Sequence, residues 1–177
     1  VAGRLEARVA TGDLQLALDG SVTVDRLAAV DGGVIDLMAQ GALTLAGSVT
    51  SGAASGPRGA VLLTALGGNL LGTIGDLIAD TAHLHAFAGA VGDEAAPLTV
   101  IRADVSNWRI GASKGIALTL GAGGIEAEYA VTEAGALLLD TKAPSTILVA
   151  GAGDIRFPGA TGTIDHRLAP GETQKTA

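Results

Sequence analysis

The 177-residue chain combines 48% hydrophobic residues with a net charge of −7, which excludes a disordered chain and, without a basic stripe, argues against nucleic acid as a partner. It has no cysteine, which excludes a disulfide scaffold and a thiolate metal site. Aromatic residues make up only 2% of the chain, whereas there are 27 glycines, so we expect thin layers of aliphatic side chains between glycine turns.

Two segments near the start of the chain, 12–24 and 33–45, repeat one pattern without gaps at an offset of 21 residues. Each segment opens with a glycine, alternates apolar and polar residues, and reaches a second glycine before it alternates again. Alternation with a period of two residues is typical of a β-strand with one buried face. The equal spacing therefore predicts a repeated pair of short strands, and repeats of this length indicate a stacked solenoid.

The same pattern continues along the chain with insertions. After a loop at 51–57, further copies occur at 59–67, 82–88, 115–121, 135–139 and 153–157. The triplet 75–77 (Gly-Asp-Leu) also repeats the triplet 12–14. The best candidate for a helix is 70–80, but its two glycines count against it.

These repeats predict an all-β protein built as one parallel β-solenoid from residues 1–160, followed by a polar tail, linker or cap at 161–177. We expect about seven to nine coils of roughly 18–26 residues each. A single coil cannot bury its own apolar face, so each coil must stack on the next, with equivalent aliphatic side chains in contact. Alternate residues then face solvent.

The run 74–92, followed by 96–100, resembles the repeats of filamentous-haemagglutinin-like exoproteins, and so do 12–16 and 41–45. The resemblance covers roughly residues 3–160. It implies a right-handed parallel β-helix, export across a bacterial outer membrane, and a role in adhesion or as an extended stalk. We therefore expect a segment of a larger secreted or cell-surface protein that carries no cofactor and is not an enzyme.

The expected partners are neighbouring repeats of the parent chain, and host-surface or matrix glycans or proteins. No apolar run is long enough for a transmembrane helix, so membrane insertion is not expected. One alternative is a carbohydrate-binding or polysaccharide-processing β-helix, which a groove lined by charged and aromatic residues would favour. A second alternative is a filament subunit that associates end to end.

Two groups of residues are candidate binding sites. His83 and His85 lie two residues apart on an expected strand, so they share a face and could hold a transition metal, with Asp80 as a third ligand. We favour the interpretation that they are exposed polar residues. Asn107, Trp108 and Arg109 form a cluster that could stack against a sugar; the alternative is that Trp108 packs under a loop or at a solenoid end.

Other polar motifs have simpler structural interpretations. Asp13, Asp76 and Asp154 follow glycines and are expected to cap turns, because the nonapeptide pattern of calcium-binding β-rolls is absent. Glu126 and Glu128 beside Tyr129 could indicate glycoside hydrolysis, but we favour an outward-facing charged pair. The glycine-rich stretches 121–124 and 151–154 lack the lysine of a phosphate-binding loop and are expected at corners.

Overall fold

The computed structural model describes residues 3–132, 136–143, 145–151, 155–156 and 164–168. These residues form fifteen β-strands and no helix, which confirms the predicted all-β class. The segment 70–80, the best helical candidate in the sequence, lies within a strand. Its glycines and β-branched residues favour extended backbone over a helix, which agrees with the counter-argument drawn from Gly72 and Gly75.

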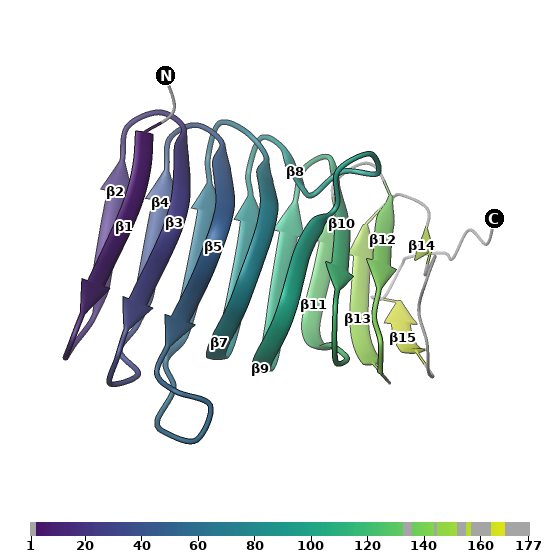
Figure 1. Ribbon diagram of the computed structural model, residues 1–177. Coiled ribbons are helices and arrows are strands. Elements are labelled where there is room, and N and C mark those ends of the chain that lie inside the picture. Colours follow the sequence, from purple (N-terminus) through teal and green to yellow (C-terminus); the bar gives the residue numbers. More distant parts are fainter. Residues whose placement is uncertain (1–2, 133–135, 144, 152–154, 157–163, 169–177) are drawn as a thin grey trace.

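The strands lie in two rows, which Figure 1 shows one behind the other. The front row contains β1 (Gly3–Val9), β3 (Val22–Ala29), β5 (Leu43–Ser51), β8 (Ala90–Val91), β10 (Gly115–Leu120), β12 (Leu137–Asp140) and β14 (Ile155–Arg156). The rear row contains β2 (Leu14–Leu18), β4 (Ile35–Ala39), β6 (Ala60–Ala65), β11 (Glu126–Thr132), β13 (Ser145–Gly151) and β15 (Ile164–Leu168). The long strands β7 (Leu70–Ala86) and β9 (Leu98–Ala112) begin in the front row and end in the rear row. We call one passage along both rows a winding.

Each strand pairing between described residues is parallel, and it joins a strand to its equivalent in the next winding. The front row begins β1–β3–β5–β7, and the rear row begins β2–β4–β6–β7. The strands β7, β8, β10 and β9 also close a ring of pairings. This ring arises because β8 and the start of β9 are two parts of one front-row strand, interrupted by residues 92–97, and both parts pair with β7 and β10.

The register agrees with the repeat that the sequence predicts. Leu14 pairs with Ile35 in the rear row, and Val22 pairs with Leu43 in the front row, both at the offset of 21 residues. The match of the triplet 75–77 to the triplet 12–14 is wrong, because Leu77 lies in the middle of β7 and pairs with Val49 in the front row. A shared Gly-Asp-Leu sequence therefore does not place two segments at the same corner.

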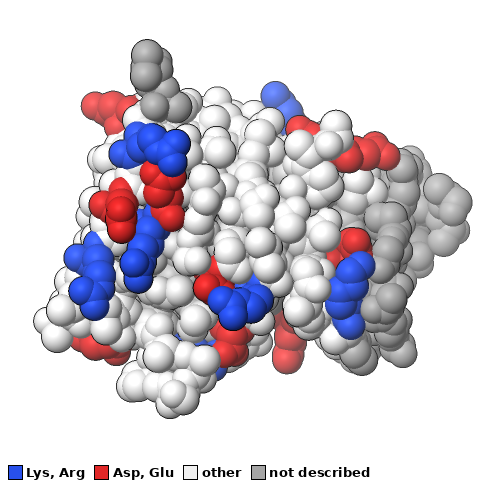
Figure 2. All heavy atoms as spheres, in the orientation of Figure 1, with Lys and Arg blue, Asp and Glu red and all other residues white. Residues whose placement is uncertain are grey.

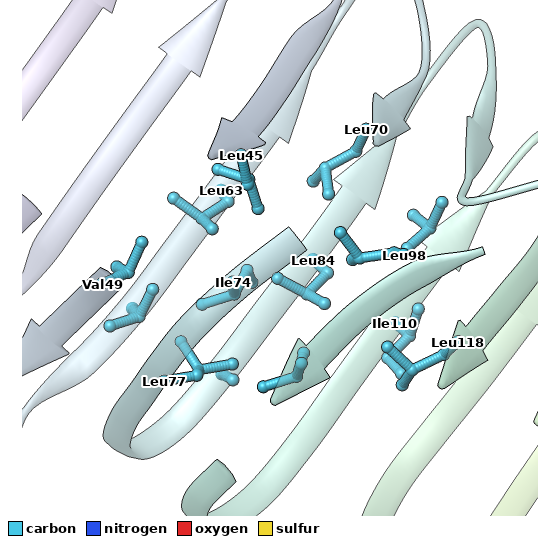
Figure 3. Packing of buried hydrophobic residues seen from close by; sticks show 14 of the residues in the cluster. Leu45, Val49, Leu63, Leu70, Ile74, Leu77, Leu84, Leu98, Ile110 and Leu118 are labelled. Carbon is cyan, nitrogen blue, oxygen red and sulfur yellow. The ribbon is translucent and has the colours of Figure 1, made fainter. Parts of the chain in front are cut away.

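The core consists of aliphatic side chains that stack in columns from one winding to the next (Figure 3). One rear-row column runs Leu16, Leu37, Leu63, Leu84 and Ile110. The last four are buried, whereas Leu16, in the first winding, is only partly buried. Fully burying such a side chain stabilises a fold by about 1.5–3 kcal/mol, so the columns supply the main favourable term of this fold.

Polar side chains at the corners bond to the backbone of the neighbouring winding. Asp13 Oδ1 accepts a hydrogen bond from the amide of Val34 at 2.8 Å, 21 residues ahead. Asn69 Oδ1 accepts in the same way from the amide of Ala90 at 2.9 Å. The turn-capping role predicted for Asp13 is therefore carried out across windings rather than within its own turn. Asp154 lies outside the described residues.

Ser51 gives a prediction for stability because its hydroxyl is buried and satisfies two backbone groups. It donates to the carbonyl oxygen of Gly33 at 2.7 Å and accepts from the amide of Gly59 at 2.8 Å. We expect Ser51→Ala to lower the free energy of unfolding by about 1–3 kcal/mol, because both backbone groups lose their partner. Urea unfolding measures this. Ser21→Ala is the control: its hydroxyl accepts one exposed bond, from Ala42, so its loss should cost less. Equal effects of the two substitutions would contradict the described contacts of Ser51.

Candidate functional site

A row of three rings stands on the outer side of β7. Strand alternation turns Ala82, Leu84 and Ala86 into the core, which leaves His83 and His85 on the outer side of the rear row. The ring centroids of His83 and His85 are 6.1 Å apart, with 27° between the ring planes. The His85 ring stacks on Phe87 at 4.0 Å and 18°. We call His83, His85 and Phe87 the histidine row.

The histidine row is built more like a stack of rings than like a metal site. The two imidazole rings are nearly parallel, and one face of the His85 ring is covered by Phe87. Among the residues that the structure describes, no three His, Cys, Asp or Glu side chains gather to hold a metal ion. Asp80 is therefore not gathered with His83 and His85 as a third metal ligand.

The second predicted cluster meets the histidine row on the same face. β9 pairs with β7 so that Arg109 lies opposite His83 and Asn107 lies opposite Thr81. Sequence reasoning treated these residues as two unrelated candidates, because 24 positions separate His85 from Arg109. Only the winding of the chain brings them together.

Trp108 points the other way, into the core, where it is fully buried. Its register partners in the adjacent windings are Ala82 and Ala127, whose small side chains leave room for the indole ring. The predicted stacking of Trp108 against a sugar therefore has no exposed ring face to use. The alternative, that Trp108 packs under a loop or at a solenoid end, does not describe its position either, because β9 is paired on both sides, with β7 and with β11.

The environment of His83 disfavours its charged form. Burial lowers the pKa of His83 below its ordinary value, and the nearby His85 and the guanidinium of Arg109 lower it further. The unfolded chain therefore binds a proton at a higher pH than the folded chain does, so stability should fall as the pH drops below about 6.5.

This pH dependence can be measured by urea unfolding at pH 7.5 and 5.5. We expect His83→Gln to reduce the loss of stability between these two pH values, because the variant has no imidazole to protonate at this position. An unchanged loss in His83→Gln would show that His83 does not contribute to it.

A shallow groove of about 310 Å³ lies beside the histidine row on the same face. It is lined by Gln15, Leu16, Ala17, Asp36, Met38 and Thr64, from the first three windings. Thr64 is the register partner of His85, so the groove and the histidine row lie in adjacent windings. Sequence reasoning missed the groove, although strict alternation in 14–18 and 35–39 already placed Gln15, Ala17, Asp36 and Met38 on the outside.

A second hollow, of about 260 Å³, lies under the loop that follows β5, which projects from the stack in Figure 1. Arg58, at the end of this loop, bonds to the carboxylate of Asp104 two windings on, at 2.6 and 2.8 Å. Arg102 pairs with Asp76 at 2.6 Å in the same hollow. Asp76 therefore forms an ion pair rather than capping a turn. In Figure 2, acidic and basic side chains of the front face lie next to each other, with uncharged surface between the groups.

The remaining candidates contribute no assembled site in the described part of the chain. Glu126 is exposed on β11, while the side chains of Glu128 and Tyr129 lie outside the described residues. Residues 121–124 form a corner between β10 and β11, as expected for that glycine-rich stretch, and most of 151–154 lies outside the description. No helix long and apolar enough to cross a membrane is present in the described ranges.

Comparisons with known proteins add no relative to this description. No family model matches the chain, and no match was found among the curated proteins or among the solved structures.

Proposed function

We propose that the chain is a right-handed parallel β-helix that serves as a rigid structural or adhesive segment of a secreted or cell-surface protein. The observation that carries the proposal is the register: parallel pairings join each winding to the next along both rows. Parallel β-crossovers are almost always right-handed, which supports the handedness. A stack of this kind gains length with every winding, at about 4.8 Å per step.

The described chain supports a mechanical role in two further ways. Its front row has eight strand positions from β1 to β14, with β8 and the start of β9 counted as one, which corresponds to a rod of about 34 Å at the usual strand spacing. Its core is almost entirely aliphatic. Rigidity and exposed loops are then what the segment contributes, in keeping with the resemblance to filamentous-haemagglutinin-like repeats.

The first winding favours a further parallel winding as a partner. β1 and β2 each pair with one strand only among the described residues. The aliphatic side chains Leu5, Leu14 and Leu16 pack on the core but are only partly buried. Another winding in the same register would cover them, and sedimentation of the purified chain over a range of concentrations tests whether a second copy does so.

Two measurements test the proposal: the shape of the purified chain in solution and its attachment to host cells or matrix. Small-angle scattering of the purified chain should give an elongated particle, and beads coated with the chain should be retained on host cells or matrix above uncoated beads. A compact sphere, or the release of products from a panel of polysaccharides, would contradict the structural role.

A further inference from the structure

We propose that the groove beside the histidine row binds a neutral carbohydrate chain. This inference goes beyond the stalk role and does not depend on it. The site consists of Gln15, Asp36, Met38 and Thr64, which line the groove, together with His85, the register partner of Thr64, and Phe87, which stacks on His85. We call it the glycan face.

The outward surface that holds these residues is continuous from one winding to the next. Register pairing links Ala17 to Met38, Met38 to Thr64, and Thr64 to His85, so one outward column crosses four windings. Three steps of about 4.8 Å give a strip about 14 Å long. One step is close to the length of a pyranose ring, so a sugar chain lying along the column would meet a new winding with each unit.

The polar side chains that line the groove carry little charge. A carboxylate (Asp36), a carboxamide (Gln15) and a hydroxyl (Thr64) offer both donors and acceptors to sugar hydroxyls. Lysine and arginine are absent from the lining, and the chain as a whole carries a net charge of −7. An anionic glycan or a nucleic acid would be repelled here, so a neutral saccharide is the fitting occupant.

The site also carries an exposed aromatic ring, that of Phe87. Phe87 is 56% exposed, the most exposed of the large hydrophobic side chains that the structure describes, although Trp108 shows that this fold can bury an aromatic ring. The ring is supported from one side by His85. Aromatic rings bury apolar area effectively when a partner covers them, and the apolar face of a pyranose is such a partner.

The position of the His85 ring is set by the following winding. A Cβ atom on Gly111, in the following winding, would lie 3.1–3.5 Å from atoms of the His85 imidazole. The ring therefore lies over Gly111, on the side away from Thr64.

Calorimetric titration and amide NMR of the whole chain test the proposal with defined probes: cellohexaose, maltohexaose and chitohexaose as neutral chains, and a heparin hexasaccharide as the anionic one. We expect at least one neutral probe to shift the amide resonances of 15–17, 36–38 and 62–66. We also expect Phe87→Ala and Asp36→Asn each to weaken that binding at least tenfold. Both side chains lie outside the core, so both variants should fold as the unaltered chain does. Circular dichroism spectra of the variants check this.

Ile101→Ala is the matched control, because Ile101 is 51% exposed on the front-row half of β9 and should leave binding unchanged. The proposal is overturned if no neutral probe shifts these resonances. It is also overturned if the heparin hexasaccharide alone binds this face, or if Phe87→Ala and Asp36→Asn bind as the unaltered chain does.

Discussion

Replacing Leu63 with alanine is expected to lower the free energy of unfolding by about 2–5 kcal/mol, because the loss of a buried leucine leaves a cavity that the close-packed column cannot fill. Leu63 is fully buried, and it lies between Leu37 and Leu84 of the adjacent windings. Urea unfolding followed by circular dichroism gives the difference. Leu16→Ala is the matched control in the same column, and its effect should be smaller because Leu16 is only partly buried.

The coupling between column members makes this prediction specific to a stack. Leu37 and Leu63 are register partners, so a double-mutant cycle between them should show an interaction energy of about 0.5 kcal/mol or more. Leu37 and Leu84 are two windings apart, and their effects should add. A coupling as large for the distant pair as for the adjacent pair would contradict the stacking.

A substitution of Gly72 by alanine is expected to destabilise the fold by about 2–6 kcal/mol, from backbone strain of about 1–3 kcal/mol and overpacking of about 1–3 kcal/mol. Gly72 has a φ of 113°, and a Cβ atom there would overlap the carbonyl oxygen of Leu45, its register partner in the preceding winding. The added methyl group would force β5 and β7 apart. The midpoint of urea unfolding reports the loss.

Gly12→Ala separates these two effects. Gly12 also has a positive φ, of 84°, but a Cβ atom at this corner would meet no atom within 4 Å. Only the strain remains, so we expect a loss of about 1–2 kcal/mol. If Gly72→Ala lowers the free energy of unfolding no more than Gly12→Ala does, the backbones of β5 and β7 are not as close at Gly72 as described.

The sequence predicted the all-β class and the register of the first windings, because both leave a regular pattern in the sequence. Alternation in 12–24 and 33–45 determines which side chains face inward, and the spacing of Gly12 and Gly33 determines the step. Prediction failed where the chain departs from that step. The triplet 75–77 copies a corner in sequence but lies mid-strand, because β7 passes from the front row to the rear row without a break.

The candidate site was less predictable, because it is assembled from residues far apart in the chain. His83 and Arg109 lie opposite each other only because the insertion at 92–97 lengthens that winding to a step of 26 residues. The orientation of Trp108 could have been derived from alternation, since it shares its parity with Ile110 and Ala112, which are buried. The exposure of Phe87 could likewise have been derived from alternation, since Phe87 shares its parity with the outward-facing His83 and His85 in the copy 82–88.

The distances between spin labels along one outward column test the stacking most directly, and the absence of cysteine makes specific labelling simple. Gln15, Asp36, Leu62, His83 and Arg109 occupy successive windings of that column. With one label at Gln15, the distance to the second label should increase by about 4.8 Å per winding, reaching about 19 Å at Arg109. A distance from Gln15 to Arg109 no longer than that from Gln15 to Leu62, as in a sheet that closes on itself, would contradict the account.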